Sequence, residues 1–391
     1  MMKNTYIRYV VAVMAIIVSC KKPYDPQVVS SNNHYLVVEG VINSGNDSTF
    51  ISLSKTVKLS ENVTTQQVTN YTVIVEGEQG SKYTLHSEGN GKYDIGPMNL
   101  DASKKYRLHL IEPGGKEYAS DYVEVRQNPA IDSIGFAPIN NNLRIYVNTH
   151  NATNNTRYYR WDYSETWRFH ARYPSGYIVD PVTKQVRQRR LGEDVYYCFG
   201  NDNSTIITLA SSEKLAQDVI FQAPLTTIIN NSEKIELRYS ILLKQYALTK
   251  DGYQFWENLK KNTEQLGSIF DAQPTQLQGN IHNINDPAEP IIGYISVTNV
   301  QSKRIFIDNT QLPQDWFAKY PYDCDRPDSA LFYNPQTKSD DVQQIIINGG
   351  AIPISTIFGA VSLLGYTYSS PSCADCSIRG RVQQPSFWKD K

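Results

Sequence analysis

The chain has 391 residues, with 38 Lys and Arg against 39 Asp and Glu and a formal net charge of −1. That length is enough for two or three domains with complete cores, and the near-neutral charge excludes a strongly basic nucleic-acid-binding surface. The 27 tyrosines, together with abundant Val, Ile and Thr, are typical of a mainly β protein. We interpret these tyrosines as side chains that fill half-buried strand positions, although tyrosine also suits binding surfaces.

The N-terminal segment has the features of an export signal. Lys3 and Arg8 precede the apolar run 9–18, which is too short to span the ~30 Å core of a bilayer. The run ends at Ser19-Cys20, where a small residue provides a cleavage site and the thiol can accept a lipid. We therefore predict that residues 1–19 are a signal peptide and that Cys20 is the lipidated first residue of the mature chain. The alternatives are an ordinary secretory signal and an N-terminal helix with a chance cysteine.

The mature chain is expected in the cell envelope, attached to a membrane by this lipid. Removal of the two basic signal-peptide residues leaves 36 basic and 39 acidic residues, a net charge of −3. Residues 20–33 are polar and contain prolines, so we predict an extended tether. No later segment reaches 18 consecutive apolar residues, so the sequence predicts no further membrane span.

Residues 34–127 predict an N-terminal β-sandwich domain. Short alternating segments are separated by turn-forming residues such as Gly89-Asn90-Gly91, a spacing typical of antiparallel sandwiches. The predicted strands are 34–41, 49–53, 72–76, 83–86, 106–111 and 118–125. Their order is generically similar to Ig-like and carboxypeptidase-regulatory-like modules, which predicts tandem sandwich domains.

Residues 128–311 predict a second β domain that carries one α-helix. The predicted strands are 143–149, 157–171, 206–209, 219–222, 234–247 and 292–298, and the polar segment 173–191 is expected to be a surface loop or hairpin. The helix is predicted over 249–266, with Thr249 as its N-cap and Gly267 as its stop. Its apolar side chains fall on one face, so we expect it to pack on a sheet.

Residues 312–391 predict a loop-rich C-terminal region stapled by disulfides. Four cysteines remain besides Cys20, and an even number in an oxidising envelope indicates two disulfides. These four are Cys198, Cys324, Cys373 and Cys376. They permit three pairings, of which we favour those that join Cys324 to the C-terminal pair. A four-cysteine zinc site and a redox CxxC remain alternatives, but the first lacks a second CxxC and the second lacks a strand-to-helix context.

The sequence offers no recognisable catalytic constellation. GxSxG, HExxH and phosphate-binding glycine motifs are missing, and the odd separation of Glu165 and His170 places them on opposite strand faces. We therefore predict a non-enzyme with no catalytic residue, metal or cofactor. His282, in a turn-rich segment, is a candidate ligand or partner contact, with a hydrogen-bonded loop as the alternative.

Three aromatic residues form the other candidate contact. Trp161, Tyr163 and Trp167 share one strand face because their spacing is even. Side chains on such a face form either part of the core or a platform for a ligand.

Four sequence blocks together resemble a known family. They are YYRWDYSETWRFH (158–170), the segment 237–286, PIIGYIS (290–296) and the C-terminal CADC…PSFW (373–388). These blocks are similar to the domain of unknown function 4249 family of Bacteroidetes-type lipoproteins, and the resemblance extends from about residue 20 to 388. It implies an outer-membrane lipoprotein encoded beside a TonB-dependent receptor, and it brings no established activity. Lys21-Lys22-Pro23 departs from the acidic export signals of such proteins, which leaves both the periplasm and the cell surface open.

The leading hypothesis is a non-enzymatic accessory protein that docks on a TonB-dependent outer-membrane transporter and helps to capture its substrate. The small-molecule ligand is not identified by the sequence. The second hypothesis is a structural or assembly scaffold of the envelope without a small ligand, and the third is an unrecognised hydrolase.

Overall fold

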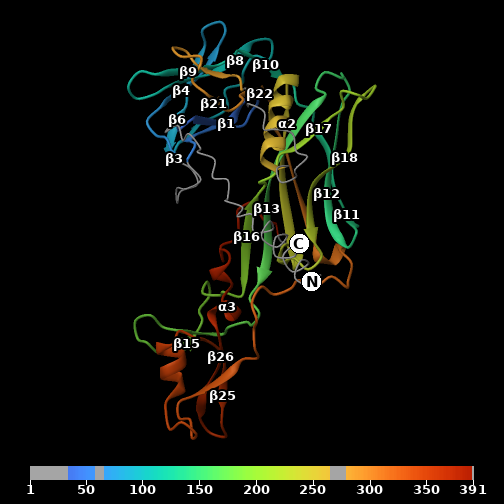
Figure 1. Ribbon diagram of the computed structural model, residues 1–391. Helices are drawn as coiled ribbons and strands as arrows, with labels where there is room; N and C mark the ends of the chain where they lie inside the picture. Colours follow the sequence, from blue (N-terminus) through green and yellow to red (C-terminus); the bar gives the residue numbers. More distant parts are fainter. Residues whose placement is uncertain (1–33, 58–65, 265–278, 390–391) are drawn as a thin grey trace, which may run out of the picture. The chain divides into compact units, whose positions relative to one another are not determined.

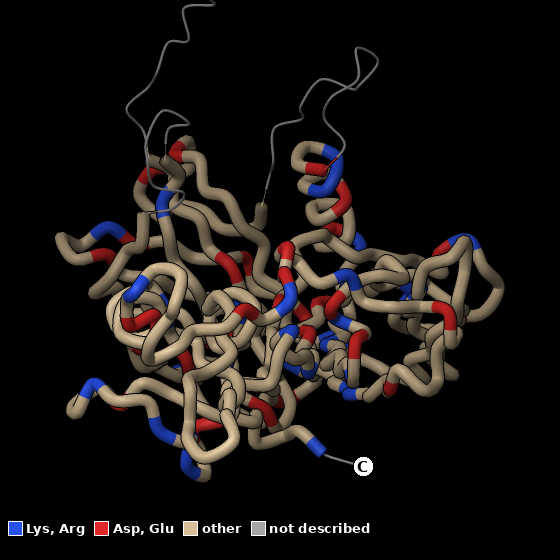
Figure 2. The backbone as a smooth tube through the Cα atoms, turned by 90° about the horizontal axis from the view of Figure 1, so that it is seen from below, with Lys and Arg blue, Asp and Glu red and all other residues tan. Residues whose placement is uncertain are grey.

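The computed structural model describes residues 34–57, 66–264 and 279–389, so Cys20, the expected tether and Gly267 lie outside the described residues. The chain divides into residues 1–35 and a compact unit that spans Leu36–Lys391, and the following description concerns this second unit. The unit is mainly β, as predicted. Basic and acidic residues are interspersed along its backbone (Figure 2). None of the helices within the described ranges has the length and hydrophobicity needed to cross a membrane.

The N-terminal strands form two joined layers around one core (Figure 1). They are β1 (Leu36–Asn43), β2 (Thr49–Lys55), β3 (Gln66–Gln67), β4 (Thr72–Gly77), β5 (Lys82–Thr84), β6 (His86–Gly89), β7 (Lys92–Ile95), β8 (Lys105–Ile111), β9 (Glu117–Ser120) and β10 (Val123–Arg126). Alternation along β4 and β8 buries Val73, Val75, Leu108 and Leu110. Each such buried side chain stabilises the fold by about 1.5–3 kcal/mol. The predicted sandwich is therefore confirmed.

Two local features of this sheet differ from the prediction. The expected strand 118–125 is interrupted at Asp121 and Tyr122, because β9 pairs with β8 and β20 (Ile281–Asn283) while β10 pairs with β8 and β22 (Ser296–Thr298). A single continuous strand there was wrong. The short strands β20, β21 (Ile291–Ile292) and β22, expected within the second domain, pair with this N-terminal sheet. The alternation of apolar and polar residues along a strand does not reveal which distant segment the strand pairs with.

The second β region is a sandwich of two antiparallel sheets. One sheet contains β11 (Ile131–Ile139), β12 (Asn142–Asn151) and β18 (Asp218–Ile229); the other contains β16 (Tyr197–Asn203), β13 (Tyr158–His170), β17 (Thr208–Ser211), β19 (Arg238–Ala247) and β23 (Gln301–Asp308). Leu143 and Ile145 from the first sheet share a core with Trp161 and Ile241 from the second. The pleat of β13 and β19 therefore directs alternate side chains inward, as the pattern predicted.

The α-helix α2 (Lys250–Glu264) packs on this second sandwich, beside β13 and β17 (Figure 1). Thr249 is its N-cap, because the Thr249 Oγ1 accepts a hydrogen bond from the Gly252 N–H at 3.1 Å. Phe255 is buried, and its ring centroid lies 5.6 Å from that of Tyr294. These contacts confirm the predicted cap and the predicted packing on a sheet.

The segment before β19 was predicted incorrectly as strand. Glu233–Ile235 instead forms a 3-10 turn, and Ser232 caps it by accepting a hydrogen bond from the Lys234 N–H. The strand begins only at Arg238. A serine cap followed by an acidic residue is a start signal for a helical turn, which competes with the alternation that favours a strand.

The C-terminal region is loop-rich and also contains a small antiparallel sheet that the sequence pattern had not indicated. Its elements are the 3-10 turn Asn309–Gln311, β24 (Asp328–Leu331), the π-helix Val342–Asn348, β25 (Ile352–Phe358), β26 (Leu363–Ser369), α3 (Pro371–Ala374) and the 3-10 turn Cys376–Ile378. The predicted hairpin is present as β14 (Tyr177–Val179) and β15 (Val186–Gln188). The hairpin forms its own two-stranded sheet and packs against this one, since Tyr177 contacts Tyr366 in the shared core.

Candidate functional site

All four cysteines of the described chain form disulfides. Cys198 on β16 is bonded to Cys376, and Cys324 is bonded to Cys373. The predicted pair of disulfides, with Cys324 joined to the C-terminal CxxC, is confirmed. Because each cysteine of the CxxC is bonded to a cysteine outside that motif, the zinc and redox alternatives are not supported.

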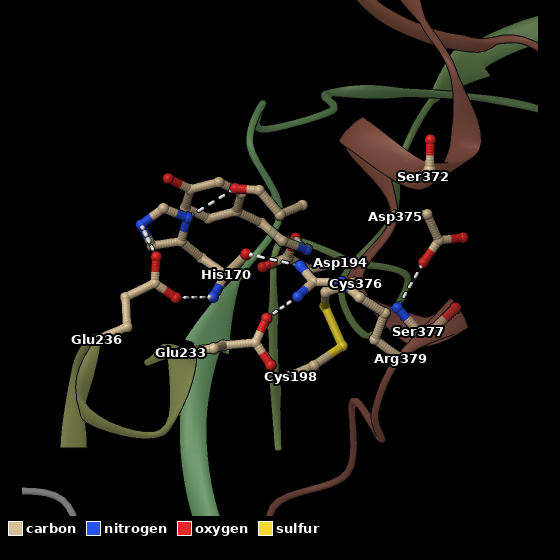
Figure 3. The surroundings of a disulfide bond; sticks show 12 residues. His170, Asp194, Cys198, Glu233, Glu236, Ser372, Asp375, Cys376, Ser377 and Arg379 are labelled. Atoms are coloured by element: carbon tan, nitrogen blue, oxygen red, sulfur yellow. Dashed lines mark hydrogen bonds and ion pairs between the residues drawn. A yellow bond between two sulfur atoms is a disulfide. The ribbon is translucent and has the colours of Figure 1, made fainter. Parts of the chain in front are cut away.

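An arginine-centred cluster lies beside the Cys198–Cys376 disulfide (Figure 3). The guanidinium of Arg379 is 4.6 Å from the ring centroid of Phe169 and 4.8 Å from that of Tyr320. It forms an ion pair with Glu233, and its Nη2 donates hydrogen bonds to the Tyr320 hydroxyl and to the His170 carbonyl oxygen. We call these residues the Arg379 cluster. The cluster holds the C-terminal tail against β13. Its charged and polar groups are paired with one another, which indicates a structural role.

Two further carboxylates, Glu236 beside His170 and Glu165 on β13, also have partners within the protein. Glu236 accepts a hydrogen bond from the His170 N–H at 3.1 Å, and its Oε1 is 3.3 Å from the His170 Nε2. Burial raises the pKa of Glu236, and the neighbouring imidazole opposes that rise. Glu165 lies elsewhere, where it accepts a hydrogen bond from the Tyr239 hydroxyl at 2.6 Å. Glu165 and His170 therefore have separate partners, as the odd spacing predicted.

A cleft of about 970 Å³ is the larger candidate site. One wall comes from β1, β2, β6 and β7, and the other from β13, β19, α2 and the loop after β16. The lining includes Glu39, Phe50, Lys92, Arg160, Asp162, Tyr163, Ser204, Lys244, Tyr246 and Trp256. This volume is near the upper end of the range for small-molecule sites, which is about 300–1,000 Å³.

A second arginine cluster forms one wall of the cleft. The Arg160 guanidinium lies 4.6 Å from the ring centroid of Tyr246 and 4.1 Å from that of Trp256. Its Nη2 donates a hydrogen bond to the Asp162 carboxylate at 2.9 Å. We call these four residues the Arg160 cluster. Such stacked rings stabilise a cation by up to about 2 kcal/mol when water is excluded, so this guanidinium is fixed in position.

The same cluster presents charge and aromatic surface together. Arg160 is 8 % exposed, whereas the Asp162 side chain is 43 % exposed. Burial raises the pKa of the Tyr246 hydroxyl, and the Asp162 charge adds to that rise. The wall therefore offers a neutral phenol, an indole and an accessible carboxylate beside a buried cation.

The opposite wall includes the place where β1 and β2 approach each other at Gly40. Gly40 has φ +148°, and a Cβ there would lie 2.5 Å from the Phe50 carbonyl oxygen, so the close approach of β1 and β2 requires glycine. The Phe50 side chain is 57 % exposed. The wall thus presents an uncovered aromatic ring, and the charged side chains of Glu39 and Lys92 also line the cleft.

The structure separates the predicted contact residues. Trp161 is fully buried and donates from Nε1 to the Gln245 Oε1 at 2.9 Å, and Trp167 packs at the edge of the same core and donates to Glu233. Tyr163 is buried but also lines the cleft. His282 lies on β20, with its Nε2 3.5 Å from the Asp121 carboxylate, and is not among the lining residues. All three aromatics therefore serve the core, and Tyr163 is the one that also lines the cleft.

Sequence reasoning missed Phe50, Arg160 and Trp256. One signal was available, since Arg160 and Asp162 are two residues apart and therefore share a strand face opposite to that of Trp161. No local signal links that face to Phe50, more than one hundred positions earlier in the chain. Among the described residues, no group of three or more His, Cys, Asp or Glu side chains is arranged to hold a metal ion.

Comparisons with known proteins give one family match. A family model described as a domain of unknown function (DUF4249) matches residues 21–304. A two-domain fibronectin type-III segment from chicken tenascin is similar at 13 % identity, covering 55 % of this chain and 93 % of that chain, with a TM-score of 0.16. That score is too low to support an argument about fold or function. Among curated proteins, none matches the chain.

Proposed function

We propose, since the chain belongs to the family described as a domain of unknown function (DUF4249), that it is a non-enzymatic accessory lipoprotein of an outer membrane. In this proposal, lipid on Cys20 anchors the protein, which docks on a TonB-dependent transporter and helps to capture its substrate. The resemblance noted in the sequence supports a Bacteroidetes-type outer-membrane location and such a transporter as partner.

The cleft is the observation that carries the proposal. Its walls combine exposed or stacked aromatic rings with many polar and charged side chains. A small molecule bound there would have both rings to stack on and groups that form hydrogen bonds. The rings of Tyr246 and Trp256 are held by Arg160, and the walls lie mainly on strands and a helix rather than on loops. A site positioned in this way loses little conformational entropy when a ligand binds.

The expected anchor supports a membrane-bound partner. A lipid on Cys20 would confine the chain to the membrane surface, and confinement raises the effective concentration of each protein for the other. A modest contact between the lipoprotein and its transporter would then be sufficient.

Affinity purification tests the partner. The tagged full chain is extracted from solubilised outer membranes, and co-purifying proteins are identified by mass spectrometry. We expect a β-barrel TonB-dependent receptor with the parent and much less of it with Cys20→Ser, which cannot be acylated. Absence of any such receptor from the parent sample would contradict the proposal.

Thermal-shift measurements test the ligand. Nutrients of the classes that outer-membrane transporters import are screened, because a bound ligand raises the melting temperature by mass action. We expect at least one compound to stabilise the parent but not Trp256→Ala, with Trp388→Phe as a control outside the cleft. If the receptor is recovered and no compound gives this pattern, the alternative of a ligand-free scaffold is favoured, in keeping with the disulfide-stapled C-terminal region.

A further inference from the structure

The C-terminal sheet is built from an unusually uncharged part of the chain. Residues 342–374 contain no Asp, Glu, Lys, Arg or His over 33 positions, although 20 % of the whole chain is charged. This stretch includes β25, β26 and the turn between them. The segment 329–337, which adds the part of β24 after Asp328 and the residues that follow it, is uncharged as well.

One end of this sheet carries a group of exposed apolar side chains. They are Phe332, Tyr333, Phe358, Val361 and Leu364, with exposed fractions of 43 %, 64 %, 69 %, 97 % and 44 %. We call these five residues the apolar tip. Single exposed apolar residues are common on proteins, but a group of them marks an interaction surface.

The strand register brings the tip residues together. Phe358 is paired with Leu363 at the end of the β25–β26 hairpin, and the Phe332 N–H donates a hydrogen bond to the Leu364 carbonyl oxygen at 2.9 Å. Val361 lies in the turn of that hairpin. The tip therefore combines a hairpin turn with the end of the neighbouring strand β24 (Figure 1).

The tip is supported by a packed core and is not a loose loop. Ala330, Ile346 and Tyr366 are buried behind it, and the Phe332 ring centroid lies 6.0 Å from that of Tyr366. The chain that follows β26 is fixed by the Cys324–Cys373 disulfide. The exposed side chains are therefore presented on a structured scaffold.

We propose that the apolar tip inserts into the interfacial region of a neutral lipid bilayer. Phe358, Val361 and Leu364 supply apolar groups for the acyl boundary, and Tyr333 has a ring and a hydroxyl that suit the headgroup level. A charged side chain carried to that depth would oppose insertion, and the hairpin has none. Tyr, Phe, Trp, Met and Arg are also enriched in the cores of protein–protein interfaces, so the rings of the tip fit either kind of partner. The absence of charged residues over 342–374 is the feature that favours a bilayer.

The lack of charge also specifies the lipid. Without Lys or Arg in the hairpin, anionic headgroups have no cation there to attract. Binding should therefore depend on buried apolar area and change little with salt or with anionic lipid. This inference is independent of the transporter partner, so either proposal can fail without the other.

Vesicle flotation tests the inference. The probe is phosphatidylcholine vesicles, and the protein is the expected mature chain, residues 20–391, with Cys20→Ser so that no acyl chain contributes. We expect the parent to float with the vesicles. The double variant Phe358→Ser/Val361→Asp should partition at least about tenfold more weakly, because both substitutions remove apolar contact with the lipid. The matched control is Val182→Asp/Leu191→Asp, which changes two residues that are 86 % and 106 % exposed outside the tip, and it should float like the parent.

A spectroscopic variant locates the contact. Tryptophan emission of Phe358→Trp should shift to the blue with vesicles and be quenched by lipids brominated on their acyl chains. Flotation should persist at about 0.5 M salt, where exposed charges are screened. If melting shows that the double variant is unfolded, Leu364→Ser replaces it.

Three results would overturn the inference. They are failure of the parent to float, equal flotation of parent and folded tip variants, and binding that appears only with anionic lipid. A fourth result would come from sedimentation: the parent does not bind vesicles but forms a dimer, and the tip variant is a monomer. The tip would then be covered by a second copy of the chain.

Discussion

The Arg160 and Arg379 clusters have the same kinds of contact but differ in where their carboxylates lie. In each, an arginine side chain that is 10 % exposed stacks on aromatic rings and pairs with a carboxylate. The partner of Arg160, Asp162, is 43 % exposed and lines the cleft, whereas the partner of Arg379, Glu233, is 24 % exposed and lies beside a disulfide. The exposure of the acid and the presence of a disulfide therefore decide whether such a cluster fixes two chain segments together or forms the wall of a site.

Removing the disulfide beside the Arg379 cluster should have the largest effect. Cys198 and Cys376 are 178 positions apart, and Cys324 and Cys373 are 49 apart. A bond across a longer loop restricts the unfolded chain more, so Cys198→Ser/Cys376→Ser should lose about 5 kcal/mol and Cys324→Ser/Cys373→Ser about 4 kcal/mol. Urea unfolding with matched slopes measures both losses. A negligible loss in the first variant would show that the disulfide is not what fixes the two chain segments together at this cluster.

Neutralising each of the two arginines should destabilise the protein by different amounts. Arg379→Met leaves the Glu233 charge without its cation in a partly buried place, and we expect a loss of about 3 kcal/mol. Arg160→Met leaves Asp162, which water already reaches, so about 1 kcal/mol should be lost. Methionine keeps most of the packing volume in both. Equal losses, measured by chemical denaturation at one pH, would mean that the exposure of the acid does not separate the two clusters.

A third charge cluster, around Glu76, extends the comparison to a buried carboxylate. Burial acts to raise the pKa of Glu76, but hydrogen bonds from Lys82, Arg107 and His109 outweigh it and lower that pKa from 4.5 to about 2. The stabilisation is therefore fully present above about pH 4.5 and is lost as the pH falls through about 2. Glu76→Gln should lose about 2–3 kcal/mol at pH 7.

The pH profile provides the check on Glu76. The free energy of unfolding of the parent should fall between about pH 4.5 and 2 more steeply than that of Glu76→Gln, because only the parent takes up a proton at this site on unfolding. Glu88→Gln, which changes an exposed acid of the same sandwich, is the control and should follow the parent. Parallel profiles for Glu76→Gln and the parent would contradict the assignment.

Features that depend on local pattern could be predicted from the sequence. The β class, the Thr249 cap and the hairpin within 173–191 each arise from neighbouring residues, and all are present. The disulfide from Cys324 to the C-terminal pair could also be predicted, because the four cysteines permit only three pairings. The missed strands β16 and β23 pair with the strongly alternating β13 and β19, and this pairing compensates for their weak pattern.

The candidate site could not be predicted in the same way. Its walls lie on strands that are far apart in the sequence. β22 lies beside β1 and leads directly into β23, and Phe50 and Arg160 line one cleft. Even spacing grouped Trp161 with Trp167 correctly but could not decide between core and platform, since both place side chains on one face. The burial that makes Trp161 a core residue comes from the other sheet of the sandwich.

Loss of the Thr249 cap of α2 should have the smallest effect on stability, and it also tests how Trp256 is held in the Arg160 cluster. Thr249 caps α2 and contacts the Tyr294 hydroxyl at 3.0 Å, and α2 carries Trp256 over Arg160. Thr249→Ala should cost about 1 kcal/mol, whereas Thr249→Ser keeps the capping oxygen and should cost less. If α2 is what holds the indole over the cation, Thr249→Ala should also make Trp256 more accessible to acrylamide, as judged against Trp256→Phe. Unchanged quenching despite the loss of stability would show that the stacking on Arg160 positions Trp256 without help from the helix cap.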